Sequence, residues 1–392
     1  MKKIVYFILL MLLTINASGQ GLDSLMQSVK QNNPRLIALQ KWLDAEAVKA
    51  KTGIYPENPH VEYYHLFGNS VTLGNQQEFE IMQSFRLPGY YTSKSDVQQL
   101  QYAQKQALVQ QEIREMLHRV RLIYFKLAML TKKENMLRER SRESEKLLSL
   151  MKEGFDSGEI SKPAYDKARI YAVERNNEWQ RTLVQIEINE ARLEQLNGDH
   201  SIGHPEYAYP ENWMLPSLEV LLSSLPEQNP QLEMAQLGIS ESEKQVRHQK
   251  MNKWPTFKAG YKYETILDQS LQGFHAGISV PLWQNANKVQ SAKLQHEWSR
   301  AKHLQTESAL RVSIRSLYNE AGSLFASYTQ IRDIIAEEQL SENIFTLLQA
   351  GQISYMEYSV DSQYVWEMES SFLEMENEYY SKISELKAKV VF

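Results

Sequence analysis

The chain has 392 residues, a net charge of −5 and no cysteine. The length is enough for two or three ordinary domains, and the negative charge argues against a surface that binds nucleic acid. Without cysteine the chain has no disulfide, no thiolate metal site, no cysteine nucleophile and no cysteine that could carry a bacterial lipid anchor.

Residues 1–20 have the pattern of a secretory signal peptide. Two lysines precede a short apolar run, and small residues suited to cleavage follow at Ala17, Ser18 and Gly19. An uncleaved anchor helix is the alternative. No later stretch approaches the roughly 18 uncharged apolar residues of a spanning helix, so any membrane crossing by the mature chain has to use β-strands.

The mature chain begins with a first repeat over residues 21–198. Helical patterns fill residues 21–55 and are broken at Asn33-Pro34. Alternating apolar and polar residues then predict a β-hairpin, with strands at about 60–68 and 77–87. The rest of the repeat is expected to form a long helix, a turn and a return helix, over residues 90–153, 154–161 and 162–196 respectively.

The second repeat, residues 216–392, follows a linker at 199–215 that is rich in glycine and proline. It opens with helical patterns on both sides of Asn229-Pro230. A β-hairpin is expected over about 256–282, with a polar loop at 267–272 between its strands. The predicted long helix, turn and return helix of this repeat cover residues 283–350, 351–354 and 355–391.

Both long helices carry an apolar seam with alternating spacings of four and three residues, which is a heptad pattern on one helix face. The first seam consists of Val109, Ile113, Met116, Val120, Ile123, Leu127 and Leu130, and the second of Leu310, Ile314, Leu317, Ala321, Leu324, Tyr328, Ile331 and Ile335.

A proline precedes each long helical segment, and a glycine follows it. Gly158 follows Pro88 by 70 residues, and Gly351 follows Pro281 by the same interval. Equal intervals between the same residue types indicate an internal repeat of about 193 residues. We therefore expect one body built from two similar halves. Glycine supplies the left-handed residue that ends each long helix, and Ser161 or Ser354 can cap the next one.

The two hairpins have strands of about nine to eleven residues, the length that a tilted membrane strand needs. A small soluble sheet with one buried face is the alternative, because a period of two does not exclude it. Secretion, two hairpins and aromatic residues near the strand ends favour the membrane. The sequence predicts a mainly α-helical protein with membrane β-structure and four strands per chain.

This arrangement resembles the TolC family of outer-membrane efflux channels over essentially the whole mature chain. The most specific residues are Gly158-Glu-Ile-Ser161, Gly351-Gln-Ile-Ser354, Phe85-Arg-Leu-Pro-Gly89 and Ile278-Ser-Val-Pro-Leu-Trp283. The two proline passages, with Asn285 and Asn287, look most like the heavy-metal cation-efflux branch of the CzcC and CusC type.

The resemblance implies a homotrimer in the outer membrane of a Gram-negative bacterium, extending into the periplasm. Its twelve strands would form one β-barrel above a long α-helical, coiled-coil tunnel. It also implies a passive conduit for drugs or heavy-metal cations. Such a channel joins a periplasmic adaptor (a membrane fusion protein) and an inner-membrane RND-type pump. The adaptor-docking turns would be those that contain Gly158, Ile160, Ser161, Gly351, Ile353 and Ser354.

Acidic residues after the second turn are implied to narrow the periplasmic entrance. Glu357 matches the family pattern in position and type, whereas the next acidic position is Val360, with Asp361 adjacent. Ile353 replaces the arginine of the family. Three copies of Glu357 around one axis would repel one another, raise one another's pKa and attract cations. An ordinary solvated helix face is the alternative.

No enzyme motif is present: the sequence has no phosphate loop, nucleophile elbow or HExxH pattern. We expect no cofactor and no metal site, since His200-x-x-x-His204 lacks an evident third ligand beyond Glu206. The functions that compete with a conduit are a periplasmic coiled-coil adaptor and a secretion or structural scaffold without a lumen. The exported substrate, the identity of pump and adaptor, and the exact cleavage site do not follow from the sequence.

Overall fold

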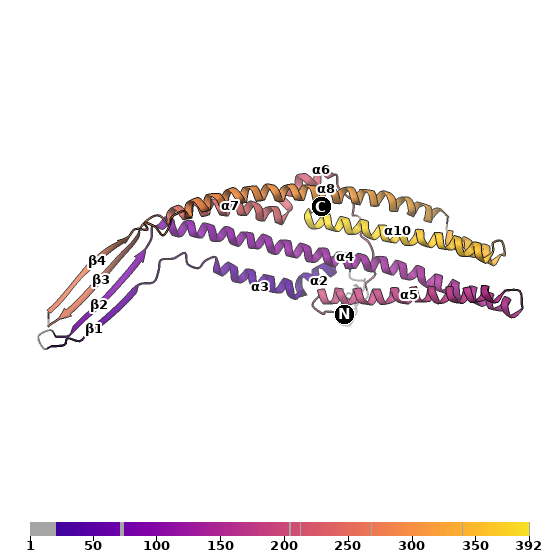
Figure 1. Cartoon of the computed structure of the whole chain (residues 1–392), viewed down its shortest axis with the longest axis horizontal. Coiled ribbons are helices and arrows are strands. Elements are labelled where there is room, and N and C mark those ends of the chain that lie inside the picture. Colours follow the sequence, from indigo (N-terminus) through magenta and orange to yellow (C-terminus); the bar gives the residue numbers. More distant parts are fainter. Residues whose placement is uncertain are drawn as a thin grey trace, which may run out of the picture. The chain divides into compact units, whose positions relative to one another are not determined.

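A computed structural model describes residues 21–391 except 71–73, 204, 212, 268 and 339, and it describes no side chains within 336–343. The predicted signal peptide, residues 1–20, lies outside the described residues. The chain is mainly helical with one four-stranded sheet (Figure 1). None of the described helices is both long enough and apolar enough to span a membrane.

The elements follow one another in the same order in both halves of the chain. The first half contains α2 (Leu22–Asn32), α3 (Pro34–Lys49), β1 (His60–Leu66), β2 (Gln76–Phe85), α4 (Pro88–Asp156) and α5 (Lys162–Leu196). The second half contains α6 (Leu218–Gln228), α7 (Pro230–Met251), β3 (Thr256–Ile266), β4 (Gln269–Ser279), α8 (Lys288–Glu338), α9 (Leu340–Gln349) and α10 (Tyr355–Lys389).

The repeat is most regular at the return helices. Helices α5 and α10 each have 35 residues. Their capping residues, Ser161 and Ser354, are 193 positions apart (354 − 161), and so are the glycines of the two turns, Gly158 and Gly351. The same sequence pattern therefore produces the same helix twice.

Contacts divide the chain into two compact units that do not coincide with the two repeats. One unit comprises Met1–Ala38, Glu112–Gln228 and Arg311–Phe392, and the other comprises Leu39–Gln111 and Asn229–Leu310. Each unit takes segments from both repeats, and α4 and α8 each contribute to both units. The two halves are thus packed together rather than folded as separate domains.

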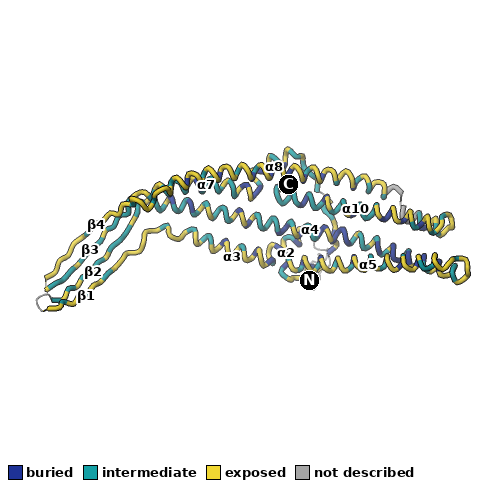
Figure 2. The backbone as a smooth tube through the Cα atoms, viewed as in Figure 1, coloured by how far each residue is buried: buried dark blue, intermediate teal, exposed yellow. Residues whose placement is uncertain are grey.

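The residues of the two predicted seams form the buried faces of α4 and α8. Every residue of the two seams is buried or half-buried, with Val120, Leu127, Ile314 and Ala321 fully inside (Figure 2). Burial of one apolar stripe per helix is what the heptad spacing requires. The stripe, rather than helix propensity alone, therefore explains why helices of this length are stable.

The linker predicted at 199–215 is more than a spacer. Tyr209 stacks on Tyr380 of α10 with ring centroids 4.4 Å apart, and Trp213 contacts Phe125 of α4 at 5.4 Å. The Tyr209 hydroxyl donates a hydrogen bond of 3.2 Å to the Phe125 carbonyl. This aromatic cluster belongs to the first unit and fastens the linker to α4 and α10.

Several element boundaries differ from the sequence prediction, among them the end of α3 at Lys49, the loop of the second hairpin and the start of α8. Residues 269–272 were expected in a loop but lie in β4, where Ile266 pairs with Gln269 across a two-residue connection. Gln272 lies on the same face as Phe274, and Leu271 lies on the opposite face with Glu264, so the alternation of apolar and polar residues breaks off here and does not reveal the strand. Helix α8 begins at Lys288 rather than at 283, because Asn287 has a left-handed backbone with φ of 60°. A left-handed residue cannot continue a right-handed helix.

A half-buried histidine couples the stability of the first unit to pH. His118 of α4 and Ser384 of α10 form a hydrogen bond of 2.9 Å between Nδ1 and Oγ. Burial, followed by the positive charges of Arg121 and Lys389, lowers the pKa of His118 from 6.5 to about 4. The neutral imidazole is therefore the folded form at neutral pH.

We predict that the folded chain loses stability as the pH falls from about 6.5 towards about 4. In this range His118 binds a proton in the unfolded chain but stays neutral in the folded chain. The loss is at most about 3 kcal/mol for this shift. His118→Gln removes the titrating group, so its melting temperature should fall less between pH 7.5 and pH 4.5. Circular dichroism melts check this, and equal falls in both proteins would contradict it.

Candidate functional site

The four strands form one antiparallel sheet in the order β1-β2-β3-β4. Glu80 of β2 pairs with Glu62 of β1 and with Lys262 of β3, and Tyr261 pairs with Phe274 of β4. The two predicted hairpins are therefore joined through β2 and β3. Because side chains alternate along each strand, this register sorts the residues onto two faces of different chemistry.

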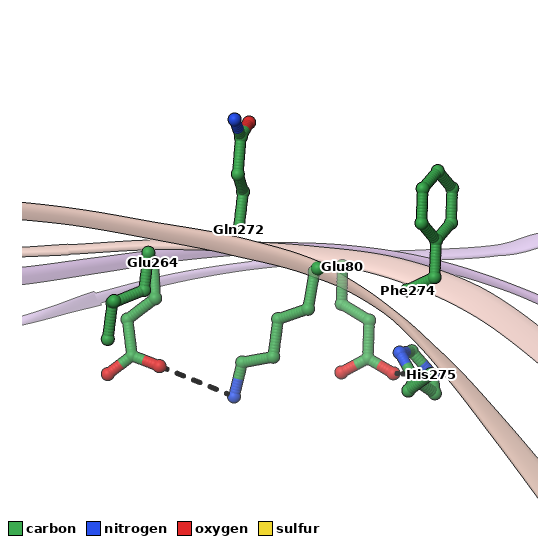
Figure 3. A pocket seen from close by; sticks show the side chains of 8 residues that line it. Glu80, Glu264, Gln272, Phe274 and His275 are labelled. Atoms are coloured by element: carbon green, nitrogen blue, oxygen red, sulfur yellow. Dashed lines mark ion pairs between the residues drawn. The ribbon is translucent and has the colours of Figure 1, made fainter.

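One face, here called the apolar face, consists mainly of large apolar and aromatic side chains. Figure 3 shows Phe274 and Gln272 on this side of the sheet, opposite Glu80, Glu264 and His275. Phe85 and Phe257 stack with ring centroids 6.0 Å apart at one end of it. The large residues of the apolar face are Val61, Tyr63, Phe79, Ile81, Phe85, Phe257, Tyr261, Tyr263, Phe274 and Ile278.

Nothing among the described residues covers the apolar face. No residue of the four described strands is buried. Phe274 is 90% exposed and Ile278 61% exposed. A contiguous exposed apolar surface of this kind is unusual in a soluble monomer and marks a site of contact with lipid or with another protein.

The other face, here called the polar face, carries polar and charged side chains that pair with one another within and between strands. Lys262 Nζ lies 2.7 Å from Glu78 Oε1 and 3.7 Å from Glu264 Oε2. His275 Nε2 lies 3.2 Å from Glu80 Oε1, and these residues line a shallow hollow (Figure 3). Such pairs stabilise a sheet and keep the carboxylates in contact with water. The polar face is suited to an aqueous path, and the apolar face is not.

The two glycine turns have the predicted backbone. Gly158 has φ of 83° and Gly351 has φ of 69°, both in the left-handed region. An added Cβ would meet no atom within 4 Å at either position, so only the backbone angle requires glycine there. In the first turn, the backbone N–H groups of Glu159 and Ile160 both donate to the Gly154 carbonyl, at 2.8 and 2.9 Å.

Isoleucines fasten both turns to one apolar cluster in the first unit. Ile160 and Ile353 pack against a buried group that includes Leu147, Met151 and Tyr358. The third residue of each proposed docking motif is therefore an anchor for the turn. The serines that follow differ: Ser354 caps α10 with its side chain, whereas Ser161 makes no side-chain capping bond to α5.

Glu357 forms a capping box with Ser354. Its carboxylate accepts a bond of 2.7 Å from the Ser354 backbone N–H, and its own N–H donates to Ser354 Oγ at 3.2 Å. These hydrogen bonds lower the pKa of Glu357. Both Glu357 and Asp361 are exposed. In the single chain Glu357 thus satisfies its own helix end, and its role in a three-fold ring stays a prediction.

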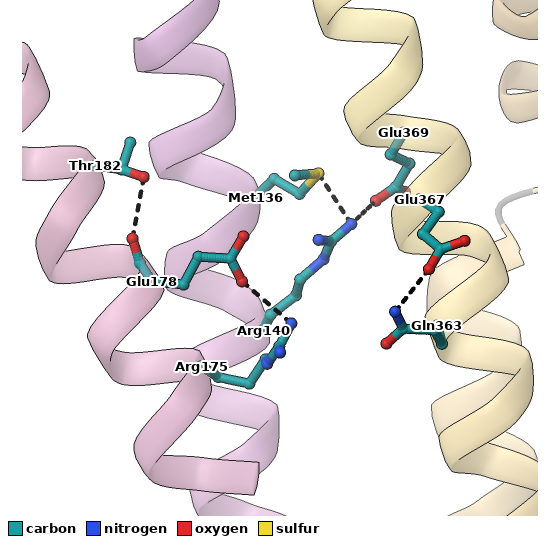
Figure 4. Close-up of polar contacts among 8 residues, drawn as sticks. All are labelled: Met136, Arg140, Arg175, Glu178, Thr182, Gln363, Glu367 and Glu369. Carbon is teal, nitrogen blue, oxygen red and sulfur yellow. Dashed lines mark hydrogen bonds and ion pairs between the residues drawn. The ribbon is translucent and has the colours of Figure 1, made fainter.

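A buried charged cluster near the turns was missed by the sequence reading. Arg140 of α4 is only 4% exposed, and its Nη2 lies 2.5 Å from Glu369 Oε2 of α10 (Figure 4). Its guanidinium lies 4.7 Å from the ring centroid of Trp366, and that of Arg175 of α5 lies 5.5 Å from the same ring. The cluster ties α4, α5 and α10 together. Burial lowers the pKa of Arg140, although Glu369 opposes this effect.

A signal for this cluster exists in the sequence. After Leu130 the buried positions of α4 are mixed: Leu137, Leu147 and Met151 are apolar, whereas Arg140, Ser141 and Ser144 are polar. Buried arginine needs a partner, so a carboxylate on a facing helix was to be expected. Only the fold identifies Glu369 as that partner, because it lies 229 residues away.

The residues that could bind metal do not converge in the part of the chain that the structure describes. No three or more histidine, aspartate or glutamate side chains come close enough there to hold a metal ion. His204, one half of the histidine pair noted in the sequence, lies outside the described residues. His200 Nδ1 lies 3.1 Å from the Asn197 carbonyl oxygen.

No protein-family model and no curated protein matches this sequence. Solved structures do match. CusC, studied for its folding and transmembrane channel formation, aligns with a TM-score of 0.78 at 15% identity over 96% of this chain and 94% of that one. A membrane protein from Pseudomonas aeruginosa aligns with a TM-score of 0.80 at 12% identity, covering 95% and 90%.

The outer-membrane channel OprN aligns with a TM-score of 0.76 at 13% identity, over 94% of this chain and 89% of that one. The chain therefore has the fold of these three proteins along nearly its whole length. The predicted fold, mainly α-helical with two repeats and four strands, is confirmed. At such low identity the likeness establishes the fold, and function is a separate inference.

Proposed function

We propose that the protein is the outer-membrane channel component of a tripartite efflux system, a passive conduit from the periplasm to the outside. The observation that carries this proposal is the sheet, whose apolar face is uncovered and whose polar face carries paired polar and charged side chains. CusC and OprN, which share the fold, are described as forming or being channels.

The sheet has the properties of a membrane-spanning strand set. Strands β2, β3 and β4 have 10, 11 and 11 residues, within the length that a tilted strand needs to cross the outer membrane. Lipid would cover the apolar face, and water would fill the side lined by the polar face. The alternation of the two faces is the pattern of a barrel with an aqueous lumen.

A single chain does not complete such a structure. In the described sheet, β1 and β4 each pair with a neighbour on one side only. Unpaired backbone at a strand edge is costly in lipid, so the edges need partners. Three chains with four strands each would supply twelve strands to one barrel, which supports a homotrimer.

Helix α4, with 69 residues, is about 100 Å long at the usual helical rise. A tunnel of such helices would extend from the outer membrane into the periplasm. We assign the turns at Gly158 and Gly351 to the periplasmic end, where a periplasmic adaptor and an RND-type pump would connect. The heavy-metal branch suggested by the sequence motifs stays a prediction, as does the chemical class of the substrate.

We predict that Phe274→Arg reduces assembly in the outer membrane, because an arginine facing mid-membrane lipid costs about 2–4 kcal/mol. His275→Arg is the matched control, since the neighbouring side chain points to the polar face. Fractionation with a urea wash, followed by detection of trimers on gels, measures both. Equal trimer yields from the two variants would argue against insertion of this sheet.

The assignment of the turns predicts proximity to an adaptor. The chain has no cysteine, so Gln352→Cys introduces the only thiol of the protein, at an exposed position beside Gly351. We expect this variant to form cross-links with the adaptor when a thiol-to-amine reagent is added to cells. Lys49→Cys, on exposed α3, should not. Cross-linking from Lys49→Cys alone would place the adaptor elsewhere.

Glu357 and Asp361 are proposed to lie at the entrance of the tunnel. We predict that Glu357→Gln weakens the block of single-channel current by divalent cations. The amide oxygen of glutamine can still accept the Ser354 N–H, so the helix cap persists while the charge disappears. Glu187→Gln, an exposed glutamate on α5, controls for general charge. Unchanged block in Glu357→Gln would place this carboxylate on an outer face.

A further inference from the structure

A cavity of about 380 Å³ opens in the second unit where β2 ends and α4 begins. Four segments line it: the connection from α3 to β1, the end of β2 with Arg86 after it, the first two turns of α4 and the start of β3 at Thr256. Its residues include Gly53, Tyr55, Glu57, Asn58, Ser84, Arg86, Tyr90, Tyr91 and Lys94. No function proposed above uses this cavity.

Two cationic side chains lie in the cavity wall. Arg86 Nη1 donates to Asn252 Oδ1 at 2.9 Å, and Lys94 Nζ donates to the Gly53 carbonyl at 2.7 Å. Among the residues that the structure describes, neither cation forms an ion pair with a carboxylate. Neutral acceptors thus position both cations, and Glu57, the carboxylate among the lining residues, forms no ion pair with either of them.

The backbone at Gly53 is fitted to this arrangement. Gly53 has φ of +67°, and a Cβ added there would lie 3.0 Å from Lys94 Nζ. Glycine therefore permits both the left-handed turn and the close approach of the ammonium group. The position of Lys94 is built into the turn rather than being one of many rotamers on an open surface.

The two positive charges also affect the pKa of a neighbouring histidine. His248 of α7 is buried, and its Nδ1 lies 3.0 Å from Ser93 Oγ. Burial first, and then the charges of Lys94 and Arg86, lower the pKa of His248. A third positive charge is thus disfavoured, whereas an anion would relieve the repulsion between the two cations.

Aromatic side chains complete the wall. The Arg86 guanidinium lies 4.3 Å from the ring centroid of Tyr90, and the Tyr91 hydroxyl accepts the Arg86 backbone N–H at 3.1 Å. Tyr55 is 72% exposed at the rim. The cavity lies beside Phe85, where the apolar face of the sheet ends. Arginine, lysine and tyrosine beside an apolar surface are the composition of a membrane interface.

We propose that this cavity binds the headgroup of an anionic phospholipid, with the phosphate oxygens accepting hydrogen bonds from Arg86 and Lys94. The proposal rests on the proposed insertion of the sheet, which would bring this end of the strands to the phosphate level of the inner leaflet. A phosphodiester carries a negative charge with which the two cations could pair, and the cavity has room for a headgroup. Tyr55 would lie against the glycerol and upper acyl region.

The test uses the full-length purified protein in a neutral detergent and native mass spectrometry. Dioleoyl phosphatidylglycerol is titrated against dioleoyl phosphatidylcholine, which has the same chains and no net charge. We expect preferential retention of phosphatidylglycerol. The double variant Arg86→Gln/Lys94→Gln should weaken that retention about tenfold or more, as expected for the loss of two charge-assisted bonds. Lys253→Gln, an exposed lysine that does not line the cavity, should leave it unchanged.

Two further arms separate the alternatives. Lys94→Arg keeps the charge and should retain binding, which guards against a double variant that merely misfolds. Inorganic phosphate at millimolar concentration should not displace the lipid; displacement would identify a free-anion site and overturn the lipid proposal. Equal retention of the two lipids by the wild type would also overturn it. If the double variant loses the trimer without any change in lipid retention, the two cations contact a neighbouring copy of the chain and do not bind lipid. This result would also overturn the proposal.

These outcomes are distinct from failure of the proposed function. Channel conductance and recovery in the outer-membrane fraction are measured on the same wild-type and double-variant proteins. If the wild type neither conducts nor fractionates with the outer membrane, the channel proposal fails whatever the lipid result. If it does both and shows no preference for phosphatidylglycerol, only the headgroup site is rejected.

Discussion

The sheet has no buried position, and this constraint governs the interpretation of the whole molecule. The helices bury a regular apolar seam, yet none of the described strand residues is buried. Folding of the single chain therefore leaves two uncovered sheet faces and two unpaired strand edges. A surface with Phe274 and Ile278 exposed needs lipid or protein to cover it. The proposals of membrane insertion and of a trimer both derive from this deficit.

The two repeats share one plan but are not equivalent at their ends. Helices α5 and α10 have the same length and follow left-handed glycines, yet only α10 begins with a side-chain cap. The buried Arg140 belongs to the first repeat and its partner Glu369 to the second. Breaking such a pair leaves a buried charge without a partner, which is costly. The repeats are thus held together by a contact that neither could form alone.

The periodic features of the fold could be predicted from the sequence. Heptad spacing, the paired breakers and Gly158 and Gly351 fixed the helices and their turns, because each depends on local residue type and spacing. Strand alternation identified the faces of β3 and most of β4. The prediction was wrong where a local pattern fits two structures. Residues 269–272 were predicted as a polar loop but pair with β3 as part of a strand. The long helix was predicted to begin at 283, but the left-handed backbone of Asn287 makes α8 begin after it.

Tertiary contacts could not be predicted from the sequence, because they join residues that are far apart in the chain. Nothing near Arg140 points to Glu369, and the cavity around Arg86 and Lys94 combines four separate segments. Glu357 illustrates a different limit. The motif at Ser354 and Glu357 is a recognisable capping box, but the sequence analysis weighed this carboxylate only as a gate residue or as part of a solvated helix face. A side chain near a helix start can serve the helix before it serves any other function.

The central claim is that the assembled protein encloses an aqueous path across the outer membrane. Single-channel recording in planar bilayers, with the purified full-length protein, tests this claim most directly. We predict stepwise, long-lived and ohmic conductance increments that appear only with the trimeric fraction. Trimers shown to be inserted in the bilayer, but without any conductance in the presence or absence of divalent cations, would contradict it.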